Sequence, residues 1–271
     1  MNAPSTNPAS FAELLQRAVT EPGTISAAYS AFHGYSIGNQ LLALVQCTER
    51  GIPPGPIATF MGWKEKGRYV KKGEKAIQLC MPVTCKREGE TTAEGETDDV
   101  TFTRFVYRNN WFVLSQTEGD DVTVPTLPEW NADRALAALD MTQVEFTHPD
   151  GNCQGYARQR TIAVSPVAAM PFKTTVHELA HVLLGHKSEG EHADDELTPR
   201  NLRECEAEAV AMVCCAALDL PGVDCCRGYI QSWWGTGNQI PERSAQRILK
   251  VADQILKAGV VAALDAMEGV R

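Results

Sequence analysis

The chain has 271 residues with 44% hydrophobic and 22% charged side chains, the composition of an ordinary globular protein. It contains no run of 18 or more apolar residues, which excludes a membrane-spanning helix. Its formal net charge is −9, so nucleic acid would repel the chain taken as a whole.

The charge is distributed unevenly along the chain. Residues 1–115 hold 12 Lys and Arg against 11 Asp and Glu, whereas residues 116–271 hold 13 against 23. Within the first half, residues 60–87 hold eight basic and two acidic side chains. One segment therefore suits an anionic partner although the whole chain does not.

The start of the chain, MNAPSTNPAS, lacks the basic-then-apolar order of a secretory signal. We expect residues 1–9 to be a disordered leader and the protein to be cytoplasmic. The nine cysteines include no Cys-x-x-Cys pair, and the neighbours Cys214-Cys215 and Cys225-Cys226 have poor geometry for a disulfide. They predict reduced thiols in preference to a cysteine metal site.

Residues 10–118 predict a small α+β domain. Ser10-x-x-Glu13 is a capping box for a helix to about residue 19, and helically spaced apolar residues then lead to Gly51, a natural helix stop. The further expected elements are a basic turn, strands at 76–83 and 100–117, and a polar hairpin loop at 85–99.

Residues 119–130 have the composition of a linker, and residues 131–271 predict a second, mostly helical domain. The whole chain is therefore expected to be α+β. The elements predicted here are a helix at 132–140, strands at 143–148 and 159–166, and helices at 173–186, 199–219, 225–235 and 242–268.

The stretch KTTVHELAHVLLGH predicts a zinc site on a helix. A spacing of four places His177 and His181 on one helix face, where both imidazoles can bind one metal ion. Glu178 follows the first histidine and is the expected catalytic base, which takes a proton from bound water. In a chain with six histidines, the string arises by chance only about 0.01 times. We expect one zinc ion per chain, with another divalent metal as the alternative.

A third ligand is required, and Glu204 is the favoured candidate. The helix NLRECEAEAVAMVCCAALDL places Glu204 and Glu208 on one face, with Glu206 pointing away. We expect Glu208 to hold a ligand histidine in its tautomer. A metzincin is excluded, because the sixth residue past His181 is a lysine. The ligand choice stays open toward Glu206 and toward four further residues: His186, His192, Asp194 and Asp195.

The segment FMGWKEKGRYVKKGEK alternates aromatic and basic side chains. Aromatic rings stack on unpaired bases and cationic groups neutralise phosphates, which favours single-stranded nucleic acid read without sequence preference. A lysine-rich turn whose aromatics belong to the core is the other interpretation. The candidate DNA-binding residues are Trp63, Lys64, Lys66, Arg68, Tyr69, Lys71, Lys72 and Lys75.

Taken in order, several stretches resemble the ArdC-type antirestriction family. YSIGNQLLALVQ, FMGWKEKGRYVKKGEKAIQL and SQTEG look like its N-terminal domain, and HELAHVLLGH, ECEAEAVAMVCCAALDL and GYIQSWW look like its zincin-like domain. The resemblance covers roughly residues 10–265. It implies non-specific single-stranded DNA binding, a gluzincin-type metallopeptidase fold, and protection of incoming mobile-element or plasmid DNA from host restriction.

The resemblance also implies that His177, His181 and one acid of Glu204-x-x-x-Glu208 bind the metal, with Glu178 as base. The presence of Glu206 as well departs from that pattern and leaves the third ligand unsettled. No motif names a protein substrate. Two alternatives remain: a DNA-tethered regulatory protease that cuts a repressor or a DNA-bound protein, and a steric DNA-binding protein whose metal is structural.

Overall fold

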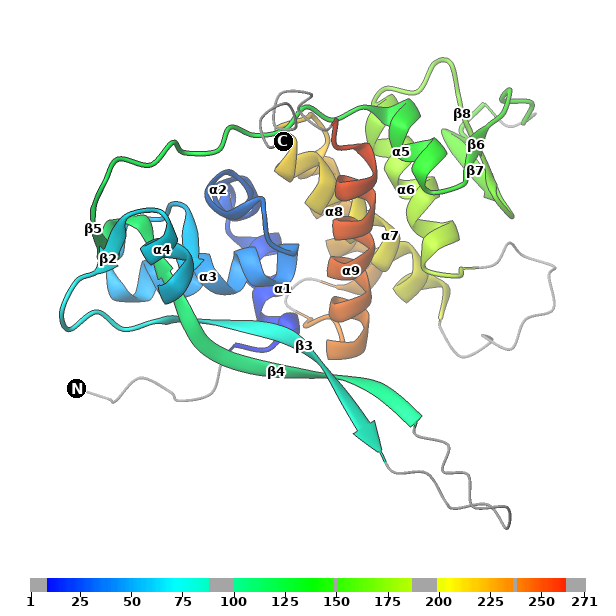
Figure 1. Ribbon diagram of the computed structural model, residues 1–271. Helices are drawn as coiled ribbons and strands as arrows, with labels where there is room; N and C mark the ends of the chain where they lie inside the picture. The colour runs from blue at the N-terminus through cyan, green and yellow to red at the C-terminus, as the bar shows by residue number, and fades with distance from the viewer. Residues whose placement is uncertain (1–8, 88–99, 149–150, 187–198, 236–237, 262–271) are drawn as a thin grey trace, which may run out of the picture. The chain divides into compact units, whose positions relative to one another are not determined.

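The computed structural model describes residues 9–87, 100–148, 151–186, 199–235 and 238–261 (Figure 1). The chain divides into two compact units. Unit 1 is α+β, and unit 2 is mostly helical with one small sheet. Unit 1 comprises Leu42–Val124; unit 2 comprises Ala9–Leu41 together with the chain from Pro125 onward. Most of the predicted leader and the candidate ligands His192, Asp194 and Asp195 lie outside the described residues.

Unit 1 is built on an antiparallel sheet of order β1-β4-β3. Its elements are the end of α3 (Ile37–Arg50), β1 (Ile57–Thr59), α4 (Phe60–Glu65), β2 (Arg68–Val70), β3 (Ile77–Arg87), β4 (Val100–Val113), the short 3-10 helix η1 (Leu114–Gln116) and β5 (Thr117–Gly119). The predicted strands are present and pair with each other, and β2 pairs separately with β5. Residues 85–87 of the predicted hairpin loop belong to β3, and residues 88–99 lie outside the described residues.

A bulge in the β3–β4 ladder is held by a side chain from α3. The strand register shifts between Ile77 and Gln78, which leaves backbone groups to be satisfied from elsewhere. The Gln46 amide donates to the Gln78 carbonyl at 2.8 Å and accepts from the Gln78 N–H at 2.9 Å. One glutamine thereby fastens helix α3 to the strand that carries the buried side chains Ile77 and Leu79.

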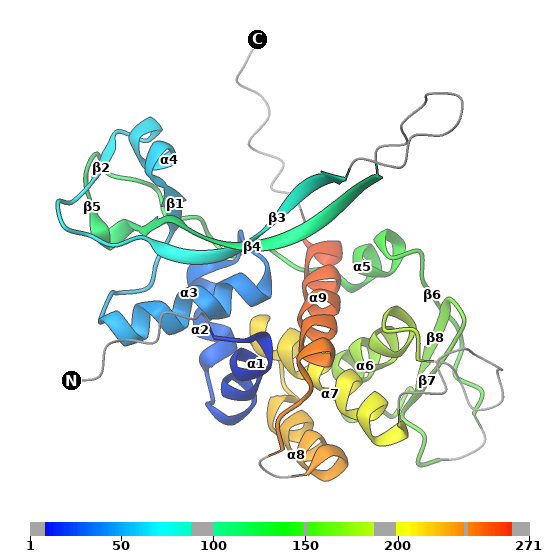
Figure 2. The same cartoon turned by 90° about the horizontal axis from the view of Figure 1, so that it is seen from below.

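In unit 2, several helices pack around α7 (Arg200–Ala217), whose residues from Cys205 to Cys215 are all buried. Helix α6 (Pro171–Leu183) packs between α7 and the small sheet, which has the order β6-β8-β7 (Figures 1 and 2). The other elements are α1 (Phe11–Thr20), α2 (Thr24–Phe32), α5 (Ala132–Ala138), β6 (Thr142–Gln143), β7 (Gly155–Arg158), β8 (Thr161–Val164), α8 (Val223–Trp234) and α9 (Glu242–Gly259).

The first two helices belong with unit 2, although they are far from it in sequence. Helix α1 packs on α9 and α2 packs on α7. The carboxylate of Glu242 accepts hydrogen bonds from the backbone N–H of Ala12 at 2.8 Å and of Phe11 at 3.3 Å, so α9 caps the start of α1. The residues of both helices lie within the predicted first domain, 10–118, whereas the break at residues 124/125 falls within the predicted linker, 119–130.

Local signals account for several element boundaries. The predicted capping box is formed: Ser10 Oγ accepts from the Glu13 N–H at 3.2 Å, and Glu13 accepts from the Ser10 N–H at 2.8 Å. Asn131 caps α5 as expected, and Pro171 occupies the first turn of α6. Helices α2 and α4 and strands β1, β2 and β7 were not predicted, and the strand expected at 143–148 is reduced to β6.

Candidate metal centre

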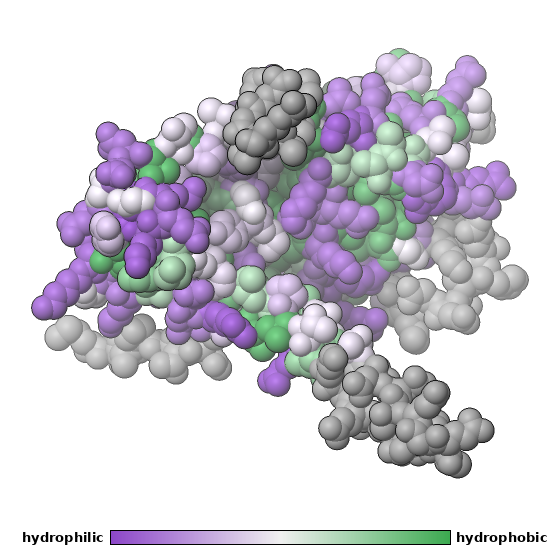
Figure 3. Space-filling model, in the orientation of Figure 1, coloured by the Kyte–Doolittle hydropathy of each residue, from purple (hydrophilic) through white to green (hydrophobic). Residues whose placement is uncertain are grey.

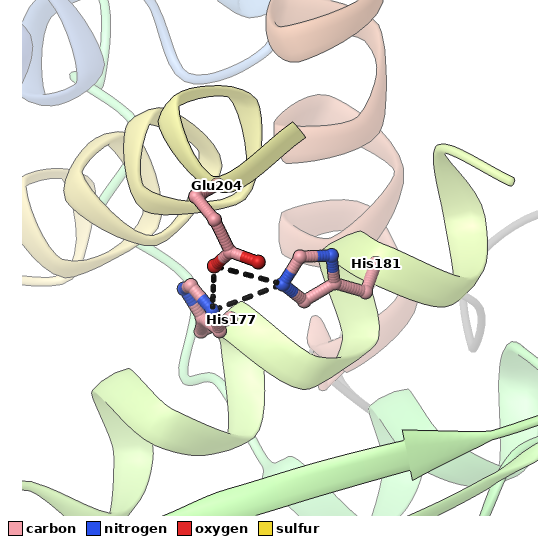
Figure 4. Close-up of side chains that lie close together, drawn as sticks. All are labelled: His177, His181 and Glu204. Atoms are coloured by element: carbon pink, nitrogen blue, oxygen red, sulfur yellow. Dashed lines mark hydrogen bonds and ion pairs between the residues drawn. The ribbon is translucent and has the colours of Figure 1, made fainter. Parts of the chain in front are cut away.

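Two helices of unit 2 bring three donor atoms together. His177 and His181 lie one turn apart on α6, and Glu204 projects from the first turns of α7 (Figure 4). The two histidine Nε2 atoms are 3.0 Å apart, and Glu204 Oε2 lies 3.6 Å from each of them. These are the three ligands that the sequence analysis favoured, and they form a potential metal-binding group.

The spacing of the donors fits a metal ion. Ligands at 2.0–2.1 Å from a tetrahedral metal lie about 3.3–3.4 Å from one another, and the distances of 3.0 and 3.6 Å bracket that value. Two imidazoles and a carboxylate form a donor set that divalent transition metals accept. The side chains of His177, His181 and Glu204 are 15%, 16% and 24% exposed, so each of the three is partly accessible to solvent.

The electrostatics of the group favour a positive charge between the three side chains. Burial lowers the pKa of His177, but contacts with Glu204 and Glu208 outweigh it and raise that pKa to about 9. Burial raises the pKa of Glu204, but its contacts with His177 and His181 prevail and hold that pKa well below its usual range. The three side chains therefore stabilise either a proton or a metal cation between them.

Glu178 is confined beside the donor group. Its side chain is buried, and burial raises the pKa of its carboxyl group while the charges of His177 and His181 oppose that rise. Strand β7 lies directly against it: a Cβ atom added to Gly155 would come within 3.1 Å of Glu178 Cγ and 2.6 Å of Thr174 Cγ2. A carboxyl group with a raised pKa next to potential ligands has the properties of a proton acceptor in catalysis.

Behind His177 lies the carboxylate of Glu208, in the position expected for it. Glu208 Oε1 is 3.3 Å from His177 Nδ1 and accepts a hydrogen bond of 2.7 Å from Lys173 Nζ. Burial raises the pKa of Glu208, but the contacts with His177 and Lys173 prevail and lower it, so the group is anionic. It can therefore hold His177 with its proton on Nδ1 and its free electron pair toward the donor group.

Behind His181 lie His186 and Glu206, for which the sequence analysis found no such role. His186 Nδ1 is 3.1 Å from His181 Nδ1, and His186 Nε2 is 2.8 Å from Glu206 Oε2. Glu206 is fully buried. Burial raises its pKa, but hydrogen bonds with His186 and Ser244 prevail and lower it. Neither His186 nor Glu206 belongs to the three-donor group within the described chain.

The structure separates the candidate DNA-binding residues into two groups. Trp63 is 1% exposed, and its Nε1–H donates to the Phe112 carbonyl at 2.8 Å, so its ring belongs to the core and cannot stack on a base. Arg68 donates to Thr117 Oγ1 at 2.8 Å and to the carbonyls of Thr117, Gly119 and Asp120, which ties β2 to β5. These two residues have structural roles.

The remaining candidates lie on the surface of unit 1. Tyr69 is 60% exposed, and Lys71 donates from Nζ to the Ser115 carbonyl at 2.9 Å while its residue stays exposed. Phe60, also in the basic segment but absent from the candidates, is 50% exposed. The other exposed candidates are Lys64, Lys66, Lys72 and Lys75.

A second exposed aromatic surface lies on the outer part of the β3–β4 hairpin, residues 81–85 and 101–108, here called the ribbon. Figure 3 shows hydrophobic residues exposed along it. Phe105 is 68% exposed and Tyr107 is 38% exposed, and their alternation places both side chains on one face. Arg104 and Arg108, also exposed, lie on the opposite face. The sequence carries a signal for this pattern, because Phe105 and Tyr107 alternate along the strand predicted at 100–117, but neither is among the predicted DNA-binding residues.

Two further observations concern membrane-spanning helices and the state of the cysteines. Among the helices of the described ranges, none combines the length and the apolar character that crossing a lipid bilayer requires. All nine cysteines lie within those ranges, and all are free thiols as predicted.

The chain is similar to one known group of proteins. Residues 15–111 match the family described as the N-terminal domain of the anti-restriction factor ArdC. The metal-free crystal structure of the antirestriction ArdC protein from R388 plasmid superposes with a TM-score of 0.51 at 23% identity, covering 92% of this chain and 94% of that one. Its Mn(II)-bound structure gives a TM-score of 0.50 at 19% identity, with 92% and 97% covered. No curated protein matches the chain.

Proposed function

We propose that this chain is an ArdC-type antirestriction protein with two functional surfaces, because residues 15–111 match the N-terminal domain of ArdC and the fold is similar to that of the R388 ArdC protein. Unit 1 binds single-stranded DNA without sequence preference. Unit 2 binds a divalent metal, zinc by preference, and hydrolyses a peptide bond. Together they protect incoming mobile-element DNA from host restriction.

The observation that carries the enzymatic part is the juxtaposition of three donors with a buried acid. His177, His181 and Glu204 approach one another to 3.0–3.6 Å, and Glu178 is buried beside them. A structural metal site is usually closed by four protein ligands, whereas a catalytic site keeps a position open beside a proton acceptor. Three protein donors within the described chain favour the catalytic kind of site.

The chemistry follows from the positions of these side chains. His177, His181 and Glu204 would hold the metal, which when bound acts as a Lewis acid toward a carbonyl and makes water more acidic. The raised pKa of Glu178 lets its carboxylate accept the proton of the attacking water and later deliver it to the amine that leaves. Glu208 keeps His177 in the orientation that the site needs.

Zinc is proposed because two histidines and a glutamate form a common ligand set of hydrolytic zinc sites. The related R388 ArdC protein has been crystallised with Mn(II), and the same donors accept either ion. Metal analysis of the purified protein, with titration of zinc and manganese into the metal-free form, distinguishes the two.

The proposed DNA surface in unit 1 combines aromatic rings with lysines. Tyr69 and Phe60 supply exposed rings, and the exposed lysines of the basic segment surround them. The ribbon extends this chemistry: Phe105 and Tyr107 recur every second residue, about 6.8 Å apart along the strand, which leaves room for one base between the rings. Arg104 and Arg108 add positive charge to the same hairpin.

The deciding experiment replaces Glu178 by Gln, which preserves size and removes the proton acceptor. Plasmid transfer into restricting and non-restricting recipients is measured for the wild type, Glu178→Gln and the exposed control Glu145→Gln. We expect Glu178→Gln to bind about one metal ion per chain and to lose protection, while Glu145→Gln keeps both. Full protection by metal-loaded Glu178→Gln would instead favour the alternative in which the protein protects DNA by steric binding and its metal is structural. If Glu178→Gln protects DNA but no longer cleaves a repressor that the wild type cleaves, the protein is a regulatory protease.

A further inference from the structure

We propose that His186, supported by Glu206, is a positioning residue that fixes the tautomer and ring orientation of His181 for metal binding. This inference rests on the metal site proposed above. It assigns a role to two polar residues that lie outside the three-donor group.

The direction of each hydrogen bond in this relay follows from the geometry. His181 turns Nε2 toward His177 and Glu204, so a neutral, metal-ready His181 carries its proton on Nδ1. Among the described residues, the acceptor for that proton is His186 Nδ1, 3.1 Å away. His186 must then carry its own proton on Nε2, from which it donates to Glu206 Oε2 at 2.8 Å. This arrangement of protons gives each of the two hydrogen bonds of the relay one donor and one acceptor.

The backbone at the end of α6 places His186 where this relay requires it. The His186 N–H donates to the His181 carbonyl at 2.9 Å, and the Gly185 N–H donates to the Val182 carbonyl at 3.1 Å. Gly185 has φ of +74°, the left-handed conformation that closes a helix and that glycine adopts without strain. The chain therefore folds back under its last turn and brings the rings of His181 and His186 to 5.2 Å between centroids.

The far end of the relay is anchored by helix α9. Glu206 is 0% exposed, and an unpaired carboxylate at such a depth would be strongly destabilising. Arg247 Nη1 lies 3.7 Å from Glu206 Oε2, and a second Arg247 nitrogen donates to the Leu184 carbonyl at the end of α6. Arg247 thus joins the buried acid to the same helix end that carries His186, which leaves the relay little freedom to move.

The two ligand histidines are consequently supported in different ways. His177 meets the carboxylate of Glu208 directly, whereas His181 reaches the carboxylate of Glu206 only through a second imidazole. A carboxylate or its equivalent behind a ligand histidine typically contributes 10–100-fold to metal affinity. The relay gives His181 that support although no acid lies within direct reach of its Nδ1 in the described chain.

The test measures metal affinity in the full-length protein, by competition of zinc and of manganese between the metal-free protein and a chelator. The variants are His186→Leu, which removes the acceptor, His186→Asn, which keeps an acceptor near the Nδ1 position, and Glu206→Gln, which keeps the size of Glu206 but not its charge. His148→Ala, at an exposed histidine of unit 2, is the control. We expect His186→Leu to bind metal about 10–100-fold more weakly, His186→Asn and Glu206→Gln to fall between it and the wild type, and the control to be unchanged.

A second readout separates positioning from general loosening of the fold. NMR of the histidine ring nitrogens should show His181 protonated at Nδ1 in the wild type and in His186→Asn, and a mixture of tautomers in His186→Leu. Should His186→Leu fail to fold, His186→Asn and Glu206→Gln decide, and wild-type affinity in both overturns the relay. Wild-type affinity in a folded His186→Leu overturns it as well. A wild-type protein that binds no metal, by contrast, refutes the proposed metal site itself.

Discussion

Three glutamates of helix α7 stand two residues apart and occupy three different positions around the site. Glu204 joins the two histidines, Glu208 lies behind His177, and Glu206 lies behind His186. Helical spacing was enough to predict the first two, because residues four apart share a face. The place of Glu206 could not be predicted in this way, since it depends on a glycine turn that returns His186 to the helix.

Trp63 shows that local composition does not predict whether an aromatic side chain is exposed or buried. An aromatic residue among lysines has the same local pattern whether it faces solvent or the core, and only the packing of α4 on the β1-β4-β3 sheet distinguishes the two. Tyr69 and Trp63 were therefore predicted alike, yet one is exposed and the other is buried.

A prediction for pH dependence follows from His177. Contacts with Glu204 and Glu208 outweigh burial and raise its pKa from 6.5 to about 9 in the folded chain. A histidine with a raised pKa stabilises the fold fully below the unfolded value and loses that contribution as pH rises through the folded value. The metal-free protein should therefore lose stability between about pH 6.5 and about pH 9, by on the order of 3 kcal/mol from this group.

Denaturant unfolding in the presence of a chelator, repeated across that pH range, measures the effect. In His177→Gln the decline should be much smaller. An equal decline in both proteins would assign it to other groups.

At the scale of elements, the contact between β7 and α6 makes Gly155 a sensitive position. A methyl group there would come within 2.6 Å of Thr174 Cγ2, 3.0 Å of the Ala163 carbonyl and 3.1 Å of Glu178 Cγ. Because the carbonyl is backbone and cannot swing aside, Gly155→Ala should cost about 1–3 kcal/mol of stability and shift Glu178. Thermal unfolding and metal binding would show a destabilised protein that still binds metal. Gly228→Ala, where a methyl group meets open space within α8, should be neutral or slightly stabilising.

The basic segment gives a second prediction at this scale. Replacing the exposed ring in Tyr69→Ala should weaken binding of a short single strand by about 1–3 kcal/mol, because one base loses its stacking partner. Lys71→Glu with Lys72→Glu should reduce the slope of log affinity against log salt, since phosphate contacts release counterions. Fluorescence anisotropy at several salt concentrations measures both quantities. Trp63→Phe is the matched control: it should lower stability and leave DNA affinity unchanged, and the opposite result would return Trp63 to the binding surface.

At the scale of the whole molecule, the strongest signals in the sequence were those that act locally. The capping box at Ser10, the stop at Gly51 and the histidine spacing on α6 depend on residues within one or two turns, and the structure has each of them. The partners of α1 and α2 depend on contacts across most of the chain, which no local pattern encodes. For this reason the predicted first domain included two helices that pack with unit 2.

The contribution of α1 and α2 to the stability of unit 2 can be measured with a fragment that begins at the predicted domain boundary. Residues 119–271 lack α1 and α2, whose packing on α9 and α7 buries side chains such as Leu14, Leu15 and Ile25. The fragment should therefore unfold at a lower temperature and expose apolar surface that binds a hydrophobic dye. Adding residues 9–41 as a separate peptide should restore part of the stability. A fragment as stable as unit 2 in the intact protein would show that the early helices contribute little.

The cap that Glu242 provides to α1 also has a consequence for the order in which the chain folds during synthesis. The hydrogen bond from Ala12 to Glu242 spans 230 residues, whereas unit 1 is continuous from Leu42 to Val124. Since a chain emerges from its N-terminus, unit 1 has all its residues long before α9 exists. Helix α1 can pack its apolar face on α9 only after nearly the whole protein has been translated. Newly made chains should therefore carry a folded unit 1 before unit 2 is complete.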